Sequence, residues 1–184
     1  MSLFHSDAFL AFRSRDFSLL SVNQLCLILT IMIQEVVIAY SIYQLTQNPL
    51  SLGMIALIEL LPFICLSLIS GDWADRYNRQ KIVQWSFSCS TLIPLLFIVL
   101  FSQYQQQHIQ QNTLLCGIYS LIFCLGILRG IYSPSFNSLR PFLTPESAYS
   151  NAATWTALIW QMGGILAPLC AGLLLGQLGQ IGRA

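Results

Sequence analysis

Charged residues are scarce in this chain of 184 residues, of which Asp, Glu, Lys and Arg make up only 8%. Soluble globular domains carry about 25% charged residues, so this composition excludes an ordinary water-soluble domain. Hydrophobic residues make up 55% of the chain, which is typical of an integral membrane protein. The formal net charge is +1 and no basic run occurs, so the sequence gives no indication of nucleic-acid binding.

Patterns typical of metal sites and disulfide frameworks are also lacking. The six cysteines form no CxxC pair, and each lies within an apolar run; they are Cys26, Cys65, Cys89, Cys116, Cys124 and Cys170. We interpret them as small, buried apolar residues rather than as a disulfide framework. Asp72 and Asp75 have the spacing of possible Mg²⁺ ligands, but a hard cation needs further oxygen ligands and no second acidic cluster exists. We therefore expect no bound metal or cofactor and no enzyme activity, although an intramembrane metalloenzyme is an alternative that Mg²⁺-dependent activity would favour.

Long apolar stretches dominate what is present. A membrane-spanning helix needs about 20 mostly apolar residues. The stretches that meet this requirement are residues 17–43, 50–70, 82–102, 113–137 and 151–178. The first is too long for the hydrophobic region of a signal peptide, and no small-residue cleavage site follows it. The sequence therefore predicts an all-α polytopic membrane protein with five transmembrane helices.

Basic residues outside these stretches lie mostly on one side of the predicted membrane. They are Arg13, Arg15, Arg76, Arg79, Lys81 and Arg140. The connections at 44–51 and 103–112, on the other side, contain no Lys or Arg, and Arg183 is the single basic residue beyond the last stretch. Because Lys and Arg concentrate in cytoplasmic connections, we expect the N-terminus and the segment 71–81 to lie in the cytoplasm. The connection at 103–112, which is rich in Gln, is expected to be an external loop.

The segment 71–81, GDWADRYNRQK, holds five charged residues among its eleven. The topology rule accounts for its basic residues but not for Asp72 and Asp75, because acidic residues contribute little to orientation. An Asp can interact with the N-terminus of a helix and an Arg with the C-terminus of another. Such contacts can break and form again when two groups of helices rock against each other.

This segment resembles the loop signature G-x-x-x-D-R-x-G-R-[RK] of the major facilitator superfamily. The matching residues are Gly71, Asp75, Arg76 and Arg79. Asn78 stands where the family usually has Gly, and Gln80 stands where it has a basic residue. The resemblance implies that the segment connects the N-terminal helix bundle reversibly to the C-terminal bundle, with Asp75 and Arg76 in that role.

Other motifs extend the resemblance to nearly the whole chain. LGILRG (125–130) resembles the L-x-x-x-R pattern of the superfamily, and GGILAPLCAG (163–172) resembles the G-x-x-x-G-P-x-x-G-G pattern of its exporters, with Ala in place of two glycines. Motifs around the first two spans resemble the branch of the enterobactin exporter and the macrolide-efflux proteins. The residues that carry this last resemblance are Phe12, Arg13, Phe17, Leu19, Leu20, Leu45, Thr46, Pro49, Leu50, Leu52, Gly53, Leu61 and Pro62.

The resemblance implies a twelve-helix fold in two six-helix halves that rock around a central site. Residues 1–184 would then be an incomplete N-terminal bundle, a fragment whose partner is the missing C-terminal half. The implied function is export of a small amphiphilic or hydrophobic molecule, of drug or siderophore type, coupled to proton influx across a bacterial inner membrane. The alternatives are an importer or lipid transporter of the same fold, and a five-helix membrane protein that does not transport.

Polar residues inside the spans indicate a transport path. With 100° of rotation per residue, several polar residues of the first span point in directions within about 40° of one another around the helix axis and form a stripe. The stripe consists of Asn23, Thr30, Gln34 and Ser41, with Gln24 and Glu35 beside it. Because lipid penalises polar groups, the stripe should face a cavity or another helix. We expect Gln34 and Glu35 to line the path, with plain interhelical hydrogen bonding as the alternative.

Two acids and one base lie within the apolar spans. Inserting an acid at mid-helix costs about 2.5–3.5 kcal/mol, so Glu35 and Glu59 should have a function. A carboxyl group removed from water holds its proton more tightly, which makes both residues candidates for proton binding. Arg129 is the only base well inside a span and is expected to pair with one of them or to lie beside the proton path. For Glu59 the alternatives are a static pair with Arg129 and a position near the membrane surface.

Two rows of small residues run along the fifth span. The first row consists of Gly164, Pro168, Gly172 and Gly176, and the second row consists of Gly163, Ala167 and Ala171. Small residues let helix backbones approach closely, so this face either packs on a neighbouring span or forms a bend and seal between the two halves. The exporter resemblance favours the second role. Trp155 and Trp160 are expected to be interfacial anchors or substrate contacts, and Trp73 and Trp85 are expected to be anchors.

Overall fold

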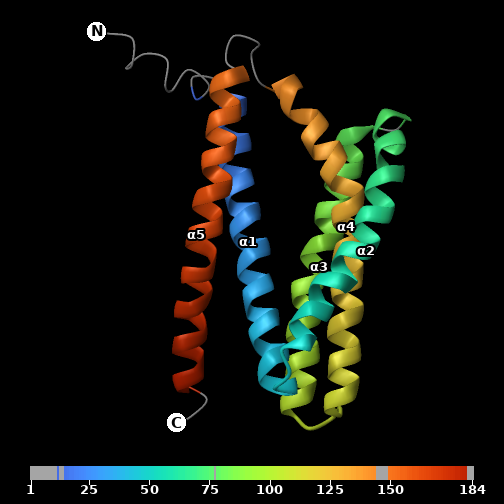
Figure 1. Ribbon diagram of the computed structural model, residues 1–184. Helices are drawn as coiled ribbons and strands as arrows, with labels where there is room; N and C mark the ends of the chain where they lie inside the picture. The colour runs from blue at the N-terminus through green and yellow to red at the C-terminus, as the bar shows by residue number, and fades with distance from the viewer. Residues whose placement is uncertain (1–11, 13–14, 77, 144–148, 182–184) are drawn as a thin grey trace. The chain divides into compact units, whose positions relative to one another are not determined.

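The computed structural model describes residues 12, 15–76, 78–143 and 149–181, and it gives the backbone alone at 16, 72–76, 79–80, 137–143 and 177–181. This part of the chain contains five α-helices and no strand (Figure 1). They are α1 (Arg15–Thr46), α2 (Leu50–Arg76), α3 (Arg79–Gln105), α4 (Gln111–Leu143) and α5 (Tyr149–Ile181). Each helix contains an apolar segment long enough to cross a membrane. The all-α class with five membrane-length helices is therefore confirmed.

Local sequence explains where α2 and α3 begin. The Asn48 side chain accepts a hydrogen bond from the Leu50 backbone N–H at 3.0 Å, and Pro49, which has no N–H to satisfy, lies in the turn directly before the helix. Asn78 caps α3 in the same way, since its side chain accepts from the Lys81 N–H at 3.4 Å and its carbonyl accepts from the Ile82 N–H at 3.2 Å. Asn78, which stands where the family signature usually has Gly, therefore lies at the N-terminal cap of α3.

The Gln-rich connection is shorter than predicted. The helices α3 and α4 extend into the stretch 103–112 from both sides and leave only residues 106–110 outside them. Gln107 closes this turn with a left-handed backbone, at φ 60°. Gln111 then donates from its side-chain amide to the Leu45 carbonyl at 2.5 Å. The turn from α3 to α4 is thereby joined to the end of α1.

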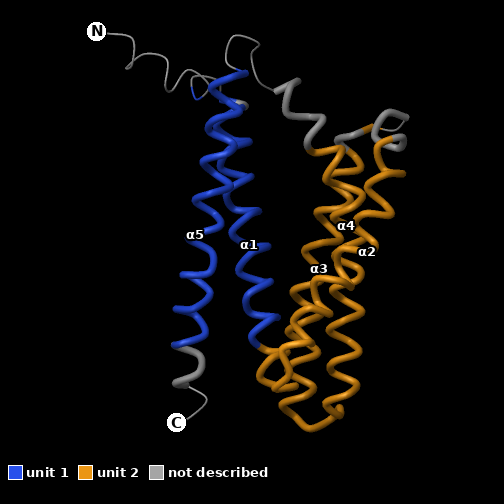
Figure 2. The backbone as a smooth tube through the Cα atoms, viewed as in Figure 1, with its two compact units in different colours: residues 1–40, 140–184 blue, residues 41–139 orange. Residues whose placement is uncertain are grey.

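The described helices fall into two compact units, which we describe separately (Figure 2). Unit 1 comprises residues 1–40 and 140–184, and in it α1 and α5 run in the same direction (Figure 1). Phe17 and Ala152 are buried together, and the ring of Phe12 meets that of Trp155 edge to face at 4.9 Å between centroids. Further along, Ile28 lies directly against Gly163. The aromatic cluster and this glycine contact hold α1 and α5 together.

Unit 2 comprises residues 41–139 and contains α2, α3 and most of α4. The helices α3 and α4 supply most of its apolar core, mainly from residues spaced four apart on one helix face. The core residues are Val83, Ile93, Phe97, Leu114, Ile118 and Ile122. Near the start of α3, Phe87 packs against Tyr132 and Phe136, at 5.1 and 6.1 Å between ring centroids. Both ends of the contact between α3 and α4 are therefore fixed by large side chains.

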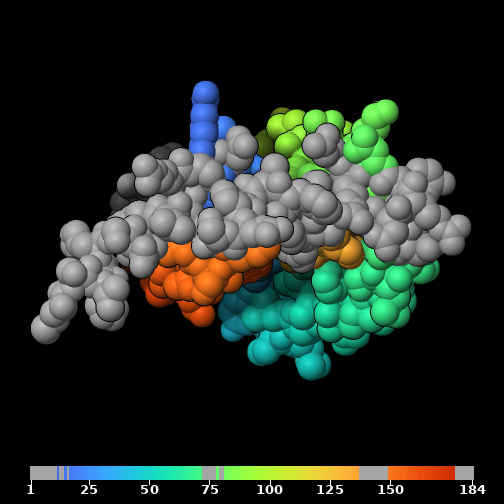
Figure 3. Space-filling view, turned by 90° about the horizontal axis from the view of Figure 1, so that it is seen from above, coloured from blue at the N-terminus to red at the C-terminus, as the bar shows by residue number. Residues whose placement is uncertain are grey.

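The outer surface of both units is apolar. Leu68 on α2 is 79% exposed and Trp85 on α3 is 72% exposed, and many other large hydrophobic residues on these helices are exposed too. The end-on view of Figure 3 shows the side chains of α2 and α3 at opposite edges of unit 2. Soluble monomers rarely expose apolar patches of more than a few hundred Å². An apolar surface of this extent is suited to contact with the hydrocarbon chains of lipids.

The expectation that the six cysteines are buried is wrong. All six are free; Cys26, Cys65, Cys116 and Cys124 are exposed, and Cys89 and Cys170 are partly buried. The reason is that lipid tails are as apolar as a helix interior, so a small apolar side chain gains little by being buried within the protein. Periodicity alone does not distinguish the lipid-facing side of such a helix from its core side.

Candidate functional site

The strongest candidate site is an ion pair inside unit 2. Arg129 of α4 donates from Nη1 to Oε1 of Glu59 of α2, and the two side chains are 24% and 17% exposed. Both residues lie inside the membrane-length segments of their helices. An isolated charge there is costly, but a pair of opposite charges joined by a hydrogen bond offsets much of that cost. The structure therefore brings Glu59 and Arg129 together, which is the static pair that the sequence analysis gave as an alternative for Glu59.

Two glycines let α2 and α4 approach closely on both sides of this pair. A Cβ atom at Gly126 would lie 2.7 Å from Cγ of Pro62 and would also clash with the Glu59 carbonyl. A Cβ atom at Gly130 would lie 3.0 Å from the Phe63 carbonyl oxygen. The hydroxyl of Ser70 donates to the Gly130 carbonyl at 2.6 Å and adds a direct link between the helices. The short side chain of Glu59 reaches Arg129 because the backbones are this close.

The other two residues predicted for the path lie on α1 in unit 1. Glu35 is exposed, and Gln34 is partly buried with its amide nitrogen lacking a hydrogen-bond partner among the described residues. The assignment of Gln34 and Glu35 to one path with Glu59 and Arg129 stays a prediction, since the two pairs belong to different units.

Sequence reasoning underestimated Gln24. Its side chain is only 3% exposed, and its amide nitrogen has no hydrogen-bond partner within the described chain. It shares a helix face with Phe17, Ser21 and Ile28, at spacings of three and four residues, and this face packs on α5. Of the predicted polar stripe, Thr30 satisfies its hydroxyl within its own helix by donating to the Cys26 carbonyl at 2.8 Å. Thr30 therefore needs no cavity partner.

The segment 71–81 forms a tight connection, with α2 ending at Arg76 and α3 beginning at Arg79. The side chains of Asp75, Arg76 and Arg79 lie outside the described part of the structure. At Gly71, a Cβ atom would meet nothing within 4 Å. No described residue of this chain therefore packs closely against Gly71.

The two small-residue rows of α5 have different environments. In the second row, Ala167 and Ala171 are fully buried, and Gly163 contacts Ile28 of α1. In the first row, a Cβ atom at Gly164, Gly172 or Gly176 would meet nothing within 4 Å, and Pro168 is exposed. The second row therefore packs within unit 1, whereas the row that matches the exporter motif is open. Trp155 joins the aromatic cluster and Trp160 is 50% exposed.

No group of three or more His, Cys, Asp and Glu side chains that could hold a metal occurs among the described residues. Among the described side chains, the charged groups that meet between α2 and α4 are the Glu59 carboxylate and the Arg129 guanidinium.

Five apolar helices of membrane length, with a partly buried ion pair between two of them, indicate a multi-pass membrane protein. The chain belongs to the Major Facilitator Superfamily, whose family model matches residues 20–182.

Comparison with curated proteins finds transporters of this superfamily. The chain is 25% identical to a Staphyloferrin A transporter of Staphylococcus aureus over 128 residues, which are 70% of this chain and 31% of that protein. It is 29% identical to the uncharacterized MFS-type transporter YkuC of Bacillus subtilis over 106 residues, 55% of this chain and 22% of the relative. It is 24% identical to YfiS of the same organism over 139 residues, 76% of this chain and 30% of the relative.

The aligned region thus spans less than a third of the length of each of these relatives. No solved structure matches the chain. The comparisons support the superfamily, while the branch of the enterobactin exporter and the macrolide-efflux proteins stays a prediction.

Proposed function

We propose that this chain is part of a proton-coupled transporter that exports a small amphiphilic or hydrophobic molecule of drug or siderophore type. The observation that carries the proposal is the Glu59–Arg129 pair inside the membrane segments. Membership of the superfamily and the similarity to a Staphyloferrin A transporter support transport of a small molecule. No catalytic residue, metal or cofactor is part of the proposal.

The pair offers a simple means of coupling. While Glu59 is ionised, it holds Arg129 by a charge-assisted hydrogen bond. Protonation of Glu59 removes that partner and leaves an uncompensated cation between α2 and α4, which then needs another anion or polar group. A substrate that binds the ionised carboxylate of Glu59 competes with the proton for it. Proton binding and substrate binding then exclude each other at Glu59, which is the requirement for exchange.

In this proposal the segment 71–81 lies in the cytoplasm, the N-terminus lies on the same side, and the membrane is a bacterial inner membrane. Gly71, Asp75, Arg76 and Arg79 form a reversible contact with a second helix bundle. The open first row of α5, with Gly164, Pro168 and Gly172, packs against that bundle in one state of the cycle. The support for this last step is that the row is apolar, small and unoccupied by any described residue.

The experiment is an efflux assay in cells that express the complete protein, with and without a proton gradient, over a panel of amphiphilic dyes and iron chelators. Efflux that collapses with a protonophore is expected. Accumulation of a dye or chelator inside the cells, driven by the proton gradient, would favour the importer alternative. If no flux of any compound depends on the proton gradient, proton coupling is contradicted.

The two rows of α5 provide a matched pair of substitutions. Gly163→Leu is expected to lower the free energy of unfolding by about 1–3 kcal/mol, because the new side chain overpacks the contact with Ile28. Gly164→Leu, one residue further along, is expected to leave the stability of this chain nearly unchanged and to slow transport by the complete protein. Unfolding in mixed micelles and the efflux assay measure the two effects. Equal loss of stability in both variants would contradict the assignment of the rows.

A further inference from the structure

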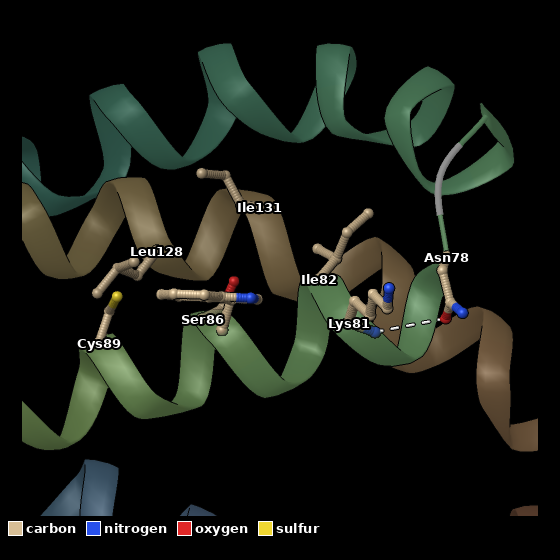
Figure 4. A pocket seen from close by; sticks show the side chains of 8 residues that line it. Asn78, Lys81, Ile82, Ser86, Cys89, Leu128 and Ile131 are labelled. Carbon is tan, nitrogen blue, oxygen red and sulfur yellow. Dashed lines mark hydrogen bonds between the residues drawn. The ribbon is translucent and has the colours of Figure 1, made fainter.

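A groove of about 550 Å³ lies between α3 and α4 in unit 2, near the beginning of α3. Six of its lining residues come from α3 and its cap, and two come from α4 (Figure 4). They are Asn78, Lys81, Ile82, Trp85, Ser86, Cys89, Leu128 and Ile131. Neither Glu59 nor Arg129 lines the groove.

The two ends of the groove differ in chemistry. Figure 4 shows Asn78 and Lys81 at one end and Cys89 with Leu128 at the other. Ile82, Cys89, Leu128 and Ile131 make the floor apolar, and the Trp85 indole on the wall is 72% exposed. Among its described lining residues, the groove is therefore an apolar channel with one cation, Lys81, at its mouth.

The limits of the membrane-length segment of α3 indicate that the charged end of the groove lies at the lipid–water boundary. The membrane-length segment of α3 begins at Lys81, so the ammonium group lies at its polar limit. Cys89 is eight residues further along the helix and therefore about 12 Å deeper. Trp85 lies between them, at the depth where aromatic residues concentrate in membrane proteins. A bound phospholipid has the same order, with its phosphate at the boundary and its acyl chain below.

The charge at the mouth has no counterion in the described chain, since no described carboxylate lies within ion-pair distance of the Lys81 ammonium. We propose that this groove is a binding site for an anionic phospholipid, whose phosphate pairs with Lys81 and whose acyl chain lies along Ile82, Cys89 and Leu128. A lipid with net negative charge fits better than a zwitterionic one, because a choline or ethanolamine group would bring a second cation to a site that already holds one.

Trp85 reports directly on occupancy, because bromine atoms on an acyl chain quench indole fluorescence on contact. The chain is placed in phosphatidylcholine nanodiscs that contain increasing fractions of dibrominated phosphatidylglycerol or dibrominated phosphatidylcholine. The signal of Trp85 is the difference between the wild type and Trp85→Phe, which removes the contribution of the other three tryptophans. We expect phosphatidylglycerol to quench this signal with about fivefold higher apparent affinity, the factor for one basic side chain at a membrane surface.

Two variants and one control complete the test. Lys81→Gln is expected to remove the preference for phosphatidylglycerol while leaving quenching by phosphatidylcholine. Leu128→Trp, which fills the groove, is expected to reduce quenching by both lipids. Its Trp85 signal is again the difference between this variant with and without Trp85→Phe. Arg15→Gln, at an exposed position on α1, should leave the preference unchanged. Equal quenching by both lipids in the wild type, or protection of Trp85 that rises with protein concentration through a second copy, would overturn the proposal.

Discussion

Replacing Arg129 with Gln is expected to lower the free energy of unfolding by about 3 kcal/mol, because Glu59 would remain as an uncompensated charge between α2 and α4. The double variant Glu59→Gln/Arg129→Gln is expected to recover most of this loss, since two amides of similar shape can form a hydrogen bond without a net charge. Unfolding of the purified chain in mixed micelles measures both values.

The comparison between single and double variants distinguishes the contribution of the ion pair to the free energy of unfolding from the contribution of side-chain packing. Arg15→Gln is the matched control, because Arg15 is exposed at the start of α1 and its loss should change stability by about 0.5 kcal/mol or less. If the double variant is as unstable as the sum of the two single variants, Glu59 and Arg129 contribute independently and the pair has no special energetic role.

Glu59→Gln is expected to lower proton-driven efflux by the complete protein about tenfold, in the range of typical coupling energies, because an amide cannot bind and release a proton. The same substitution leaves Arg129 without its carboxylate partner, so efflux is expressed per amount of folded protein in the membrane. Efflux is measured across a range of imposed gradients, with expression checked for each variant.

Glu35→Gln is the companion to this experiment. Glu35 is exposed on α1, so its replacement should not disturb folding. A fall in gradient-driven efflux similar to that of Glu59→Gln would support a path that uses both acids. Unchanged efflux in Glu35→Gln would remove Glu35 from the coupling and leave the Glu59–Arg129 pair as the sole candidate.

The sequence was sufficient to predict the fold class, because five apolar stretches of membrane length with few charges leave no other class. It also identified Glu59 and Arg129 individually, since charges are rare within such spans. It gave their pairing only as one alternative, because 70 residues separate them and helical periodicity gives a residue's face but not its neighbour. The glycines around Arg129 were the available signal, as they indicate a close helix approach at that level.

The two rows of α5 illustrate the same limit. The rows lie about 100° apart on the helix, and both are built from residues that suit close packing. Only the position of Ile28 decides that the row with Gly163 is the one packed on α1. The burial of Gln24 was missed for a related reason. Gln24 is buried because its side of α1 packs on α5, and the positions of the other polar residues on α1 do not indicate this contact. The Gln-rich turn was predicted too long because Gln is well tolerated at helix ends.

The most direct test of the proposed coupling is proton release on substrate binding, measured with a pH indicator in a weakly buffered detergent solution of the complete protein. The account predicts that wild-type protein releases protons when a transported compound is added, and that Glu59→Gln releases markedly fewer while still binding the compound. Undiminished proton release from Glu59→Gln would contradict the account.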